Sequence, residues 1–251
     1  MSKIYLIGAG PGDPELLTLK AVNAIKESDA ILYDHLINPE TLRYCKDSAE
    51  LLLVGKMKGD RTMPQEEINS LIVQMAKKYP VVSRLKGGDP FIFGRGGEEY
   101  EYCLENGFDD VTIIPGITAA LGSAASLGMP LTHRDYSSEV TFITGHRKVD
   151  DDYSAFDSIV LKNKTFVVYM AVSALGEITG EMLKNPENSD IPVAIVEKAT
   201  RHNQRMVRGT VSTIADIVKK ENVKAPALMI VGDVINFLNK TEELKNKIKH
   251  G

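Results

Sequence analysis

The most constraining feature of the sequence is the alternation of short apolar runs with helix-like segments through residues 1–114. Apolar runs of strand length occur at 3–7, 29–33, 51–54, 81–85 and 111–114. Helical spacing of apolar residues is found at 15–26, 65–78 and 97–105. This alternation is typical of a mainly parallel sheet with crossover helices, so we predict an α/β fold.

A second α/β segment follows Ile114, because Pro115 and Gly116 interrupt the pattern before a helix rich in Ala, Gly and Ser. Its strand-like runs are at 140–144, 165–170, 192–197, 204–209 and 227–231, with helical segments near 173–183 and 214–219. These strands lie closer together along the chain, so we expect some antiparallel pairing in a mixed sheet. The predicted parts are an N-terminal α/β domain at 1–114, a C-terminal α/β domain at 115–238 and a charged tail at 239–251.

Composition and charge argue against several classes of protein. A formal net charge of -4 disfavours a sequence-blind nucleic-acid binder, which needs a basic surface. Cys45 and Cys103 lie far apart without CxxC spacing, which fits a reducing compartment and predicts neither a zinc site nor a disulfide framework. The histidines show no ligand spacing, so we predict no metal. No apolar run approaches the ~20 residues of a membrane span, and we predict a cytoplasmic protein without membrane contact.

The first glycine-rich turn, GAGPGD at 8–13, lies between a predicted strand and a predicted helix. A dinucleotide-binding turn has the same position, but it requires a third glycine where this chain has Asp13. The carboxylate would repel a pyrophosphate, whereas a phosphate-free cationic cofactor would not meet that repulsion. Two alternative functions stay open. The protein could be a nucleotide-binding oxidoreductase, or a sensor without catalytic activity that only binds such a cofactor.

The second glycine-rich segment, RLKGGDPFIFGRGGEE at 84–99, has five glycines between Gly87 and Gly97. So many glycines are costly to order, which favours close approach of the backbone to a ligand. Asp89 in this segment is suited to accept a hydrogen bond from a ribose hydroxyl or an amino group.

Over residues 3–237 the chain resembles the uroporphyrinogen-III C-methyltransferases, members of the two-domain tetrapyrrole methylase family. The resemblance is carried, in order, by GAGPGDPELLTLKA at 8–21, LYDHL at 32–36, VGK at 54–56, QEEIN at 65–69, RLKGGDPFIFGRGGEE at 84–99, PGITAA at 115–120 and GMPLTHRD at 128–135. It implies two α/β domains with a cleft between them and a homodimer. It also implies methyl transfer from S-adenosylmethionine to C2 and C7 of uroporphyrinogen III, giving precorrin-2 through precorrin-1 with S-adenosylhomocysteine as the other product.

The resemblance also assigns roles to individual residues. It makes Asp34 the proton acceptor and Lys56 the proton donor. The residues that match the cofactor site are Pro11, Gly87, Gly88, Asp89, Ile92, Thr118, Ala119, Met170 and Ala199. The family usually has glycine where this chain has Ala199 and Ala171, and we expect Ala199 to narrow the cofactor pocket.

Uroporphyrinogen III carries eight carboxylates, so its site should present several cationic side chains. The substrate-binding candidates in loops are Lys58, Arg61, Arg95 and Arg134, with Lys56 and Arg147 as further cations, and we expect at most half to touch substrate. The family usually has an arginine and a histidine where this chain has Met57 and Arg61, so the segment 55–64 departs from the usual family pattern for substrate binding. An enzyme of the same fold that methylates a later corrin intermediate, a protein or ribosomal RNA stays as the second hypothesis, which GRGGEE and PLTHRD disfavour.

Overall fold

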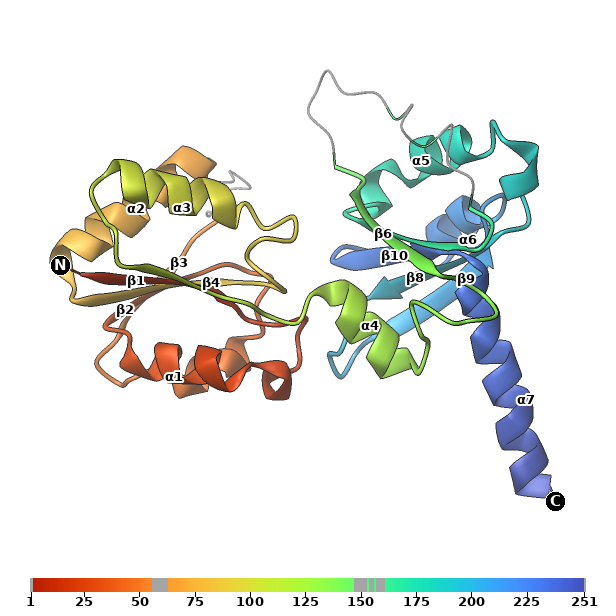
Figure 1. The fold of residues 1–251 in the computed structure, drawn as a ribbon, viewed down its shortest axis with the longest axis horizontal. Helices are drawn as coiled ribbons and strands as arrows, with labels where there is room; N and C mark the ends of the chain where they lie inside the picture. The colour runs from red at the N-terminus through yellow and green to blue at the C-terminus, as the bar shows by residue number, and fades with distance from the viewer. Residues whose placement is uncertain (1, 56–62, 147–152, 154–155, 157–160, 251) are drawn as a thin grey trace. The chain divides into compact units, whose positions relative to one another are not determined.

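A computed structural model describes residues 2–55, 63–146, 153, 156 and 161–250. The chain divides into two compact units, Met1–Ala119 and Ala120–Gly251, and each combines helices with one five-stranded sheet (Figure 1). The predicted boundary follows Ile114, at the end of a strand, and the division of the structure follows Ala119, at the start of a helix, so a short loop separates the two. Within the described residues, no helix has the length and apolar character to cross a membrane.

The N-terminal unit contains an all-parallel sheet with the strand order β3-β2-β4-β1-β5. Its strands are β1 (Lys3–Gly8), β2 (Ala30–Tyr33), β3 (Glu50–Leu53), β4 (Val81–Lys86) and β5 (Val111–Ile114). Its helices are α1 (Leu19–Glu27), α2 (Gln65–Lys78) and α3 (Gly96–Glu105). The parallel sheet predicted from the alternating pattern is therefore confirmed.

Helices cover both faces of this sheet, with α1 on one face and α2 and α3 on the other (Figure 1). On the first face Ile25 of α1 packs with Ile31 of β2 in one buried cluster. On the second face Ile72 of α2 and Cys103 of α3 pack with Leu6 of β1. The central strands β1, β2 and β4 are almost entirely buried because helices cover both faces, as is usual for parallel sheets.

The C-terminal unit contains a mixed sheet with the strand order β6-β7-β10-β8-β9. Its strands are β6 (Glu139–Thr144), β7 (Lys164–Tyr169), β8 (Pro192–Glu197), β9 (Arg205–Thr210) and β10 (Ala227–Val231). Among the described strands of this sheet, only β6 and β7 pair in parallel, and β10 pairs antiparallel with both β7 and β8, so the expected mixed sheet is confirmed.

The helices of this unit are α4 (Ala119–Leu127), α5 (Leu175–Met182), α6 (Ile214–Lys220) and α7 (Asn236–His250). Ile178 of α5 and Ile214 of α6 are fully buried and pack with Val168 and Met229 of the sheet. The lysine-rich segment predicted as a charged tail lies mostly within α7.

Candidate functional site

The segments that follow β1, β4 and β5 meet at one edge of the N-terminal sheet. These three strands are neighbours and parallel, so their carboxyl ends lie side by side. Gly88 donates a backbone hydrogen bond to Gly10 at 2.7 Å and accepts one from Gly10 at 3.2 Å. In open α/β sheets this edge is the usual place for a ligand, and both glycine-rich motifs lie there.

Glycine is required where these segments touch. A Cβ on Gly8 would lie 2.4 Å from the backbone nitrogen of Gly116, and one on Gly116 would lie 2.2 Å from the carbonyl oxygen of Gly88. Both distances are far below a van der Waals contact, so the three segments pack backbone against backbone. Gly8 and Gly116, which lie outside the glycine-rich segment predicted to approach a ligand, therefore serve contact between the loops themselves.

Asp89 joins two of these segments through its carboxylate. Its Oδ1 accepts the backbone N–H of Phe91 at 2.8 Å, and its Oδ2 accepts that of Gly116 at 3.0 Å. Each carboxylate oxygen has a second lone pair, so Asp89 keeps acceptor capacity for a ribose hydroxyl or an amino group. Its first demonstrable role is to hold the β4 and β5 loops together.

The structure brings several predicted cofactor residues together in the N-terminal unit. Pro11 follows the Gly10 backbone that pairs with Gly88. A Cβ on Gly88 would lie 3.7 Å from the Cα of Thr118 and 3.8 Å from the backbone nitrogen of Ala119. Gly87 and Ile92 belong to the same β4 loop as Asp89. Seven of the nine predicted cofactor residues therefore belong to the segments that gather at one edge of this sheet.

Met170 and Ala199 belong to the C-terminal unit. Tyr169 at the end of β7 pairs with Leu228, and Glu197 at the end of β8 pairs with Ala227. Met170 and Ala199 follow these strand ends, so both lie at the same edge of the C-terminal sheet. Met170 has a left-handed backbone, with φ 55°, and the residue is 46% exposed.

Ala171 and Ala199, where the resemblance leads us to expect glycine, occupy ordinary backbone positions. Ala171 has φ -75° and ψ -26°, which any residue adopts, and it is fully buried. Lys198 and Thr200 have positive φ values of 51° and 62°, whereas Ala199 between them does not. The backbone therefore accepts alanine at both positions without strain.

Asp34, the predicted proton acceptor, follows β2 at the same edge as the glycine loops. Its Oδ1 accepts the backbone N–H of Leu36 at 2.9 Å, and its Oδ2 accepts a hydrogen bond from Arg84 Nη2 at 2.9 Å. Its side chain is 20% exposed, so the carboxylate is oriented and still accessible. Lys56, the predicted proton donor, lies outside the described residues.

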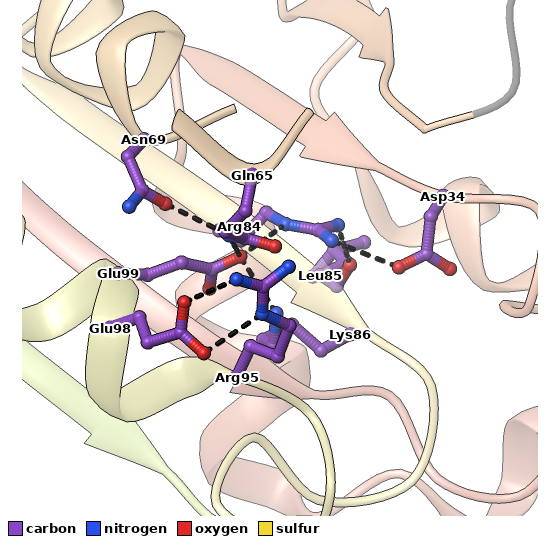
Figure 2. Close-up of polar contacts among 9 residues, drawn as sticks. All are labelled: Asp34, Gln65, Asn69, Arg84, Leu85, Lys86, Arg95, Glu98 and Glu99. Carbon is purple, nitrogen blue, oxygen red and sulfur yellow. Dashed lines mark hydrogen bonds and ion pairs between the residues drawn. The ribbon is translucent and has the colours of Figure 1, made fainter. Parts of the chain in front are cut away.

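A buried group of charges, formed by Arg84, Lys86 and Glu99, lies next to Asp34 (Figure 2). Arg84 and Lys86 of β4 both bond to Oε1 of Glu99 on α3, at 3.3 Å and 2.7 Å. Burial lowers the pKa of the Lys86 ammonium, and the charge of Arg84 lowers it further. None of these three residues was assigned a role from the sequence. The available signal was the spacing of Arg84 and Lys86, which puts two cations on the same face of a buried strand.

Two of the predicted substrate-binding cations, Arg95 and Arg134, lie within the residues that the structure describes. Arg95 has a left-handed backbone, with φ 59°, and pairs with Glu98 in the first turn of α3. With Phe91 it lines a surface hollow of about 370 Å³ in the N-terminal unit. Arg134 is exposed on a loop of the C-terminal unit. Lys58, Arg61 and Arg147 lie outside the described residues.

No cluster suited to a metal ion occurs among the residues that the structure describes, where no group of three or more His, Cys, Asp or Glu side chains converges. Within the described part of the chain, the polar groups at the site are carboxylates, hydroxyls, backbone amides and the buried cations. They suit hydrogen bonding, charge stabilisation and proton transfer.

Comparison with known proteins gives a consistent result. Residues 3–215 match the family model described as Tetrapyrrole (Corrin/Porphyrin) Methylases. The uroporphyrinogen-III C-methyltransferase of Priestia megaterium is 46% identical over 239 residues, which cover 94% of this chain and 100% of that protein. The siroheme synthase of Pseudoalteromonas translucida is 44% identical, covering 94% of this chain and 50% of its own length. The crystal structure of a uroporphyrin-III C-methyltransferase from Thermus thermophilus, complexed with S-adenyl homocysteine, superposes with a TM-score of 0.80 at 36% identity and covers 94% of both chains.

Proposed function

Because the chain belongs to the tetrapyrrole methylase family, we propose that it is an S-adenosylmethionine-dependent uroporphyrinogen-III C-methyltransferase. It transfers methyl groups to C2 and C7 of uroporphyrinogen III, giving precorrin-2 through precorrin-1 and releasing S-adenosylhomocysteine. The observation that carries this proposal is 46% identity along the whole length of the uroporphyrinogen-III C-methyltransferase of Priestia megaterium.

The residues at the edge of the N-terminal sheet fit such a cofactor. Acidic residues follow three of its strands, with Asp13 after β1, Asp34 after β2 and Asp89 after β4. Carboxylates favour a cationic sulfonium and disfavour a pyrophosphate. The loops that carry Gly88 and Thr118 would hold the nucleoside portion through their backbone groups. When bound, the cofactor supplies an activated methyl group.

Asp34 has the geometry of a proton acceptor in this reaction. Attack by an electron-rich pyrrole carbon is completed by loss of a proton from the macrocycle, and a carboxylate in reach can take it. Both oxygens of Asp34 are already oriented, by Leu36 and Arg84, so the group needs little reorganisation to act. Lys56 would serve as the proton donor, and we assign it that role from family resemblance alone.

Substrate recognition would depend on cations, since the substrate is polyanionic. Arg95 and Arg134 are exposed loop arginines suited to bidentate carboxylate contacts. Arg95 already pairs with Glu98, so a substrate carboxylate would compete with that exposed ion pair. Exposed pairs contribute at most about 1 kcal/mol, so the exchange is inexpensive.

An anaerobic assay tests the proposed activity. The protein should convert uroporphyrinogen III and S-adenosylmethionine into products that carry one and then two added methyl groups in the mass spectrum. Calorimetry should show binding of S-adenosylhomocysteine and none of NADH. If NADH binds tightly and the thioether does not, the methyltransferase assignment fails and an oxidoreductase is favoured.

A methyltransferase acting on a later corrin intermediate is the runner-up. The same assay with such an intermediate as the competing substrate separates the two, because faster methylation of the intermediate would reverse the assignment.

We also propose that the protein is a homodimer in the cytoplasm and supplies siroheme or cobalamin synthesis. Light scattering after gel filtration should give twice the chain mass of 27.6 kDa, and a monomer mass would refute the dimer.

A further inference from the structure

Strand β4 places two cations where a core would normally be apolar. Alternate residues of β4 face α2 and α3, beginning with Val82, which packs in the apolar cluster on that face. The next two positions on the face are Arg84 and Lys86, each 4% exposed. Burying charges carries a large desolvation cost, and apolar residues of similar size often give equal or greater stability. A role beyond stability is therefore the better explanation for the pair.

The guanidinium of Arg84 is held in one orientation by three separate partners (Figure 2). Its Nε donates to Oε1 of Glu99 at 3.3 Å, its Nη1 to the carbonyl oxygen of Leu85 at 2.6 Å, and its Nη2 to Oδ2 of Asp34 at 2.9 Å. A guanidinium is a rigid planar fork, so bonds in three directions fix its plane. The position of Nη2 beside Asp34 therefore depends on what holds Nε.

Glu99 is placed to hold that end of the fork. It lies in the first turn of α3 and is fully buried. Its Oε1 accepts from Arg84, from Lys86 Nζ at 2.7 Å and from Gln65 Nε2 at 3.2 Å. Its Oε2 has no hydrogen-bond partner among the described residues. In that part of the chain, all the side-chain hydrogen bonds of Glu99 therefore go through Oε1, the oxygen that holds Arg84.

We infer that Glu99 is a positioning residue, which acts through Arg84 to hold the Asp34 carboxylate in the orientation that methyl transfer requires. The inference rests on the proposed function, because Asp34 matters only if the chain performs that reaction. Glu99 is fully buried and makes no hydrogen bond to Asp34 itself, so it would act on Asp34 only through Arg84. Its loss would free Nε, let the guanidinium turn, and leave Asp34 with the Leu36 amide as its remaining fixed contact.

Three variants of one helix test the inference first. Glu99→Met removes the acceptor at similar volume, Glu99→Gln keeps Oε1 as an acceptor, and Glu101→Met is the matched control on the exposed side of α3. We expect kcat of Glu99→Met to fall about 100-fold, the size of a small misplacement of a reacting group, with S-adenosylhomocysteine affinity changed only a few-fold. Glu99→Gln should recover most of kcat. Unchanged kcat in Glu99→Met would overturn the inference.

A paired replacement separates positioning from stability. Lys86→Met with Glu99→Met removes one buried cation and one buried anion together, so the remaining pair of Arg84 and Asp34 stays balanced. The double variant should regain thermal stability lost in Glu99→Met while kcat stays low. If kcat recovers together with stability, Glu99 serves the fold only and the inference is refuted. This variant also carries the test if Glu99→Met does not fold.

A double-mutant cycle asks whether Glu99 works through Asp34. In an Asp34→Glu background, which keeps a carboxylate but displaces it by one methylene, Glu99→Met should lower the residual kcat little further, because residues that act as one unit are strongly non-additive. Losses that simply multiply would show that Glu99 acts by another route.

The geometry has a readout that needs no activity. In a protein labelled with nitrogen-15 arginine, Arg84 should give an Nε–H signal protected from solvent exchange. The protection should disappear in Glu99→Met and persist in Glu101→Met. If wild-type protein shows this behaviour but does not methylate uroporphyrinogen III, the proposed function fails and the contact stands. If the protein methylates uroporphyrinogen III but the protection of the Arg84 Nε–H signal is the same in Glu99→Met as in the wild type, the inference fails and the proposed function stands.

Discussion

Gly116→Ala should damage both stability and cofactor binding, because one methyl group has no space there. The new Cβ would lie 2.2 Å from the carbonyl oxygen of Gly88 and 2.8 Å from the Cα of Gly8. A relaxed carbon–oxygen contact is about 3.3 Å, so the β4 and β5 loops must separate by roughly 1 Å. That movement also stretches the 3.0 Å bond from the Gly116 amide to Asp89.

The magnitude follows from two contributions. Overpacking costs about 1–3 kcal/mol, and one weakened backbone hydrogen bond adds about 1 kcal/mol. For a chain of this size each kcal/mol lowers Tm by about 2–4 °C, so Gly116→Ala should lower Tm by roughly 5–15 °C. Affinity for S-adenosylhomocysteine should fall as well, since the displaced loops carry Gly88 and Thr118.

Differential scanning fluorimetry and calorimetry measure the two effects. Gly97→Ala is the matched control, because a Cβ at Gly97 meets nothing within 4 Å and its backbone does not need glycine. Its Tm should stay equal or rise slightly, as alanine favours helix over glycine. If Gly116→Ala keeps the wild-type Tm and affinity, the loops do not depend on this close packing and the reasoning is wrong.

Three further outcomes follow from the site. Asp34→Ala should abolish turnover while S-adenosylhomocysteine binding changes only a few-fold by calorimetry; undiminished turnover would remove the proton-acceptor role. Asp89→Asn replaces one acceptor oxygen by a donor facing an N–H group, so Tm should fall by an amount matching about 1–3 kcal/mol, and an unchanged melting curve would contradict the bonds to Phe91 and Gly116. Burial raises the pKa of the Cys103 thiol to about 11, so at pH 8 almost no thiolate is present and a thiol reagent should reach Cys103 only after unfolding; rapid labelling in the native protein would contradict its burial.

Much of the fold was predictable because local pattern and tertiary structure agree. The helix at 65–78 and the strands at 111–114, 192–197 and 227–231 have the predicted bounds. The helix expected at 15–26 is instead a 3-10 helix, Pro14–Leu16, followed by α1 from Leu19. The cause is Thr18, whose side chain caps α1 by accepting the backbone N–H of Ala21 at 3.1 Å. A threonine before an apolar helical run is a capping signal that would have placed this start correctly.

The site was less predictable, because its important contacts join residues far apart in sequence. Asp34 could be singled out from resemblance, but its pairing with Arg84 depends on β2 lying next to β4 in the sheet. Glu99 reaches Arg84 because α3 packs on the face toward which alternate β4 residues point. Sheet order and helix placement are tertiary facts, so no local pattern assigns Glu99 a role.

The identity of the methylated carbons tests the central claim most directly. Uroporphyrinogen III should be incubated anaerobically with excess S-adenosylmethionine that carries a carbon-13 methyl group, and the product should be studied by NMR. Two labelled methyl signals are expected, with couplings that place them on C2 and C7. Labelled methyl groups on other ring carbons, or no transfer to this substrate while a later intermediate is methylated, would contradict the proposed function.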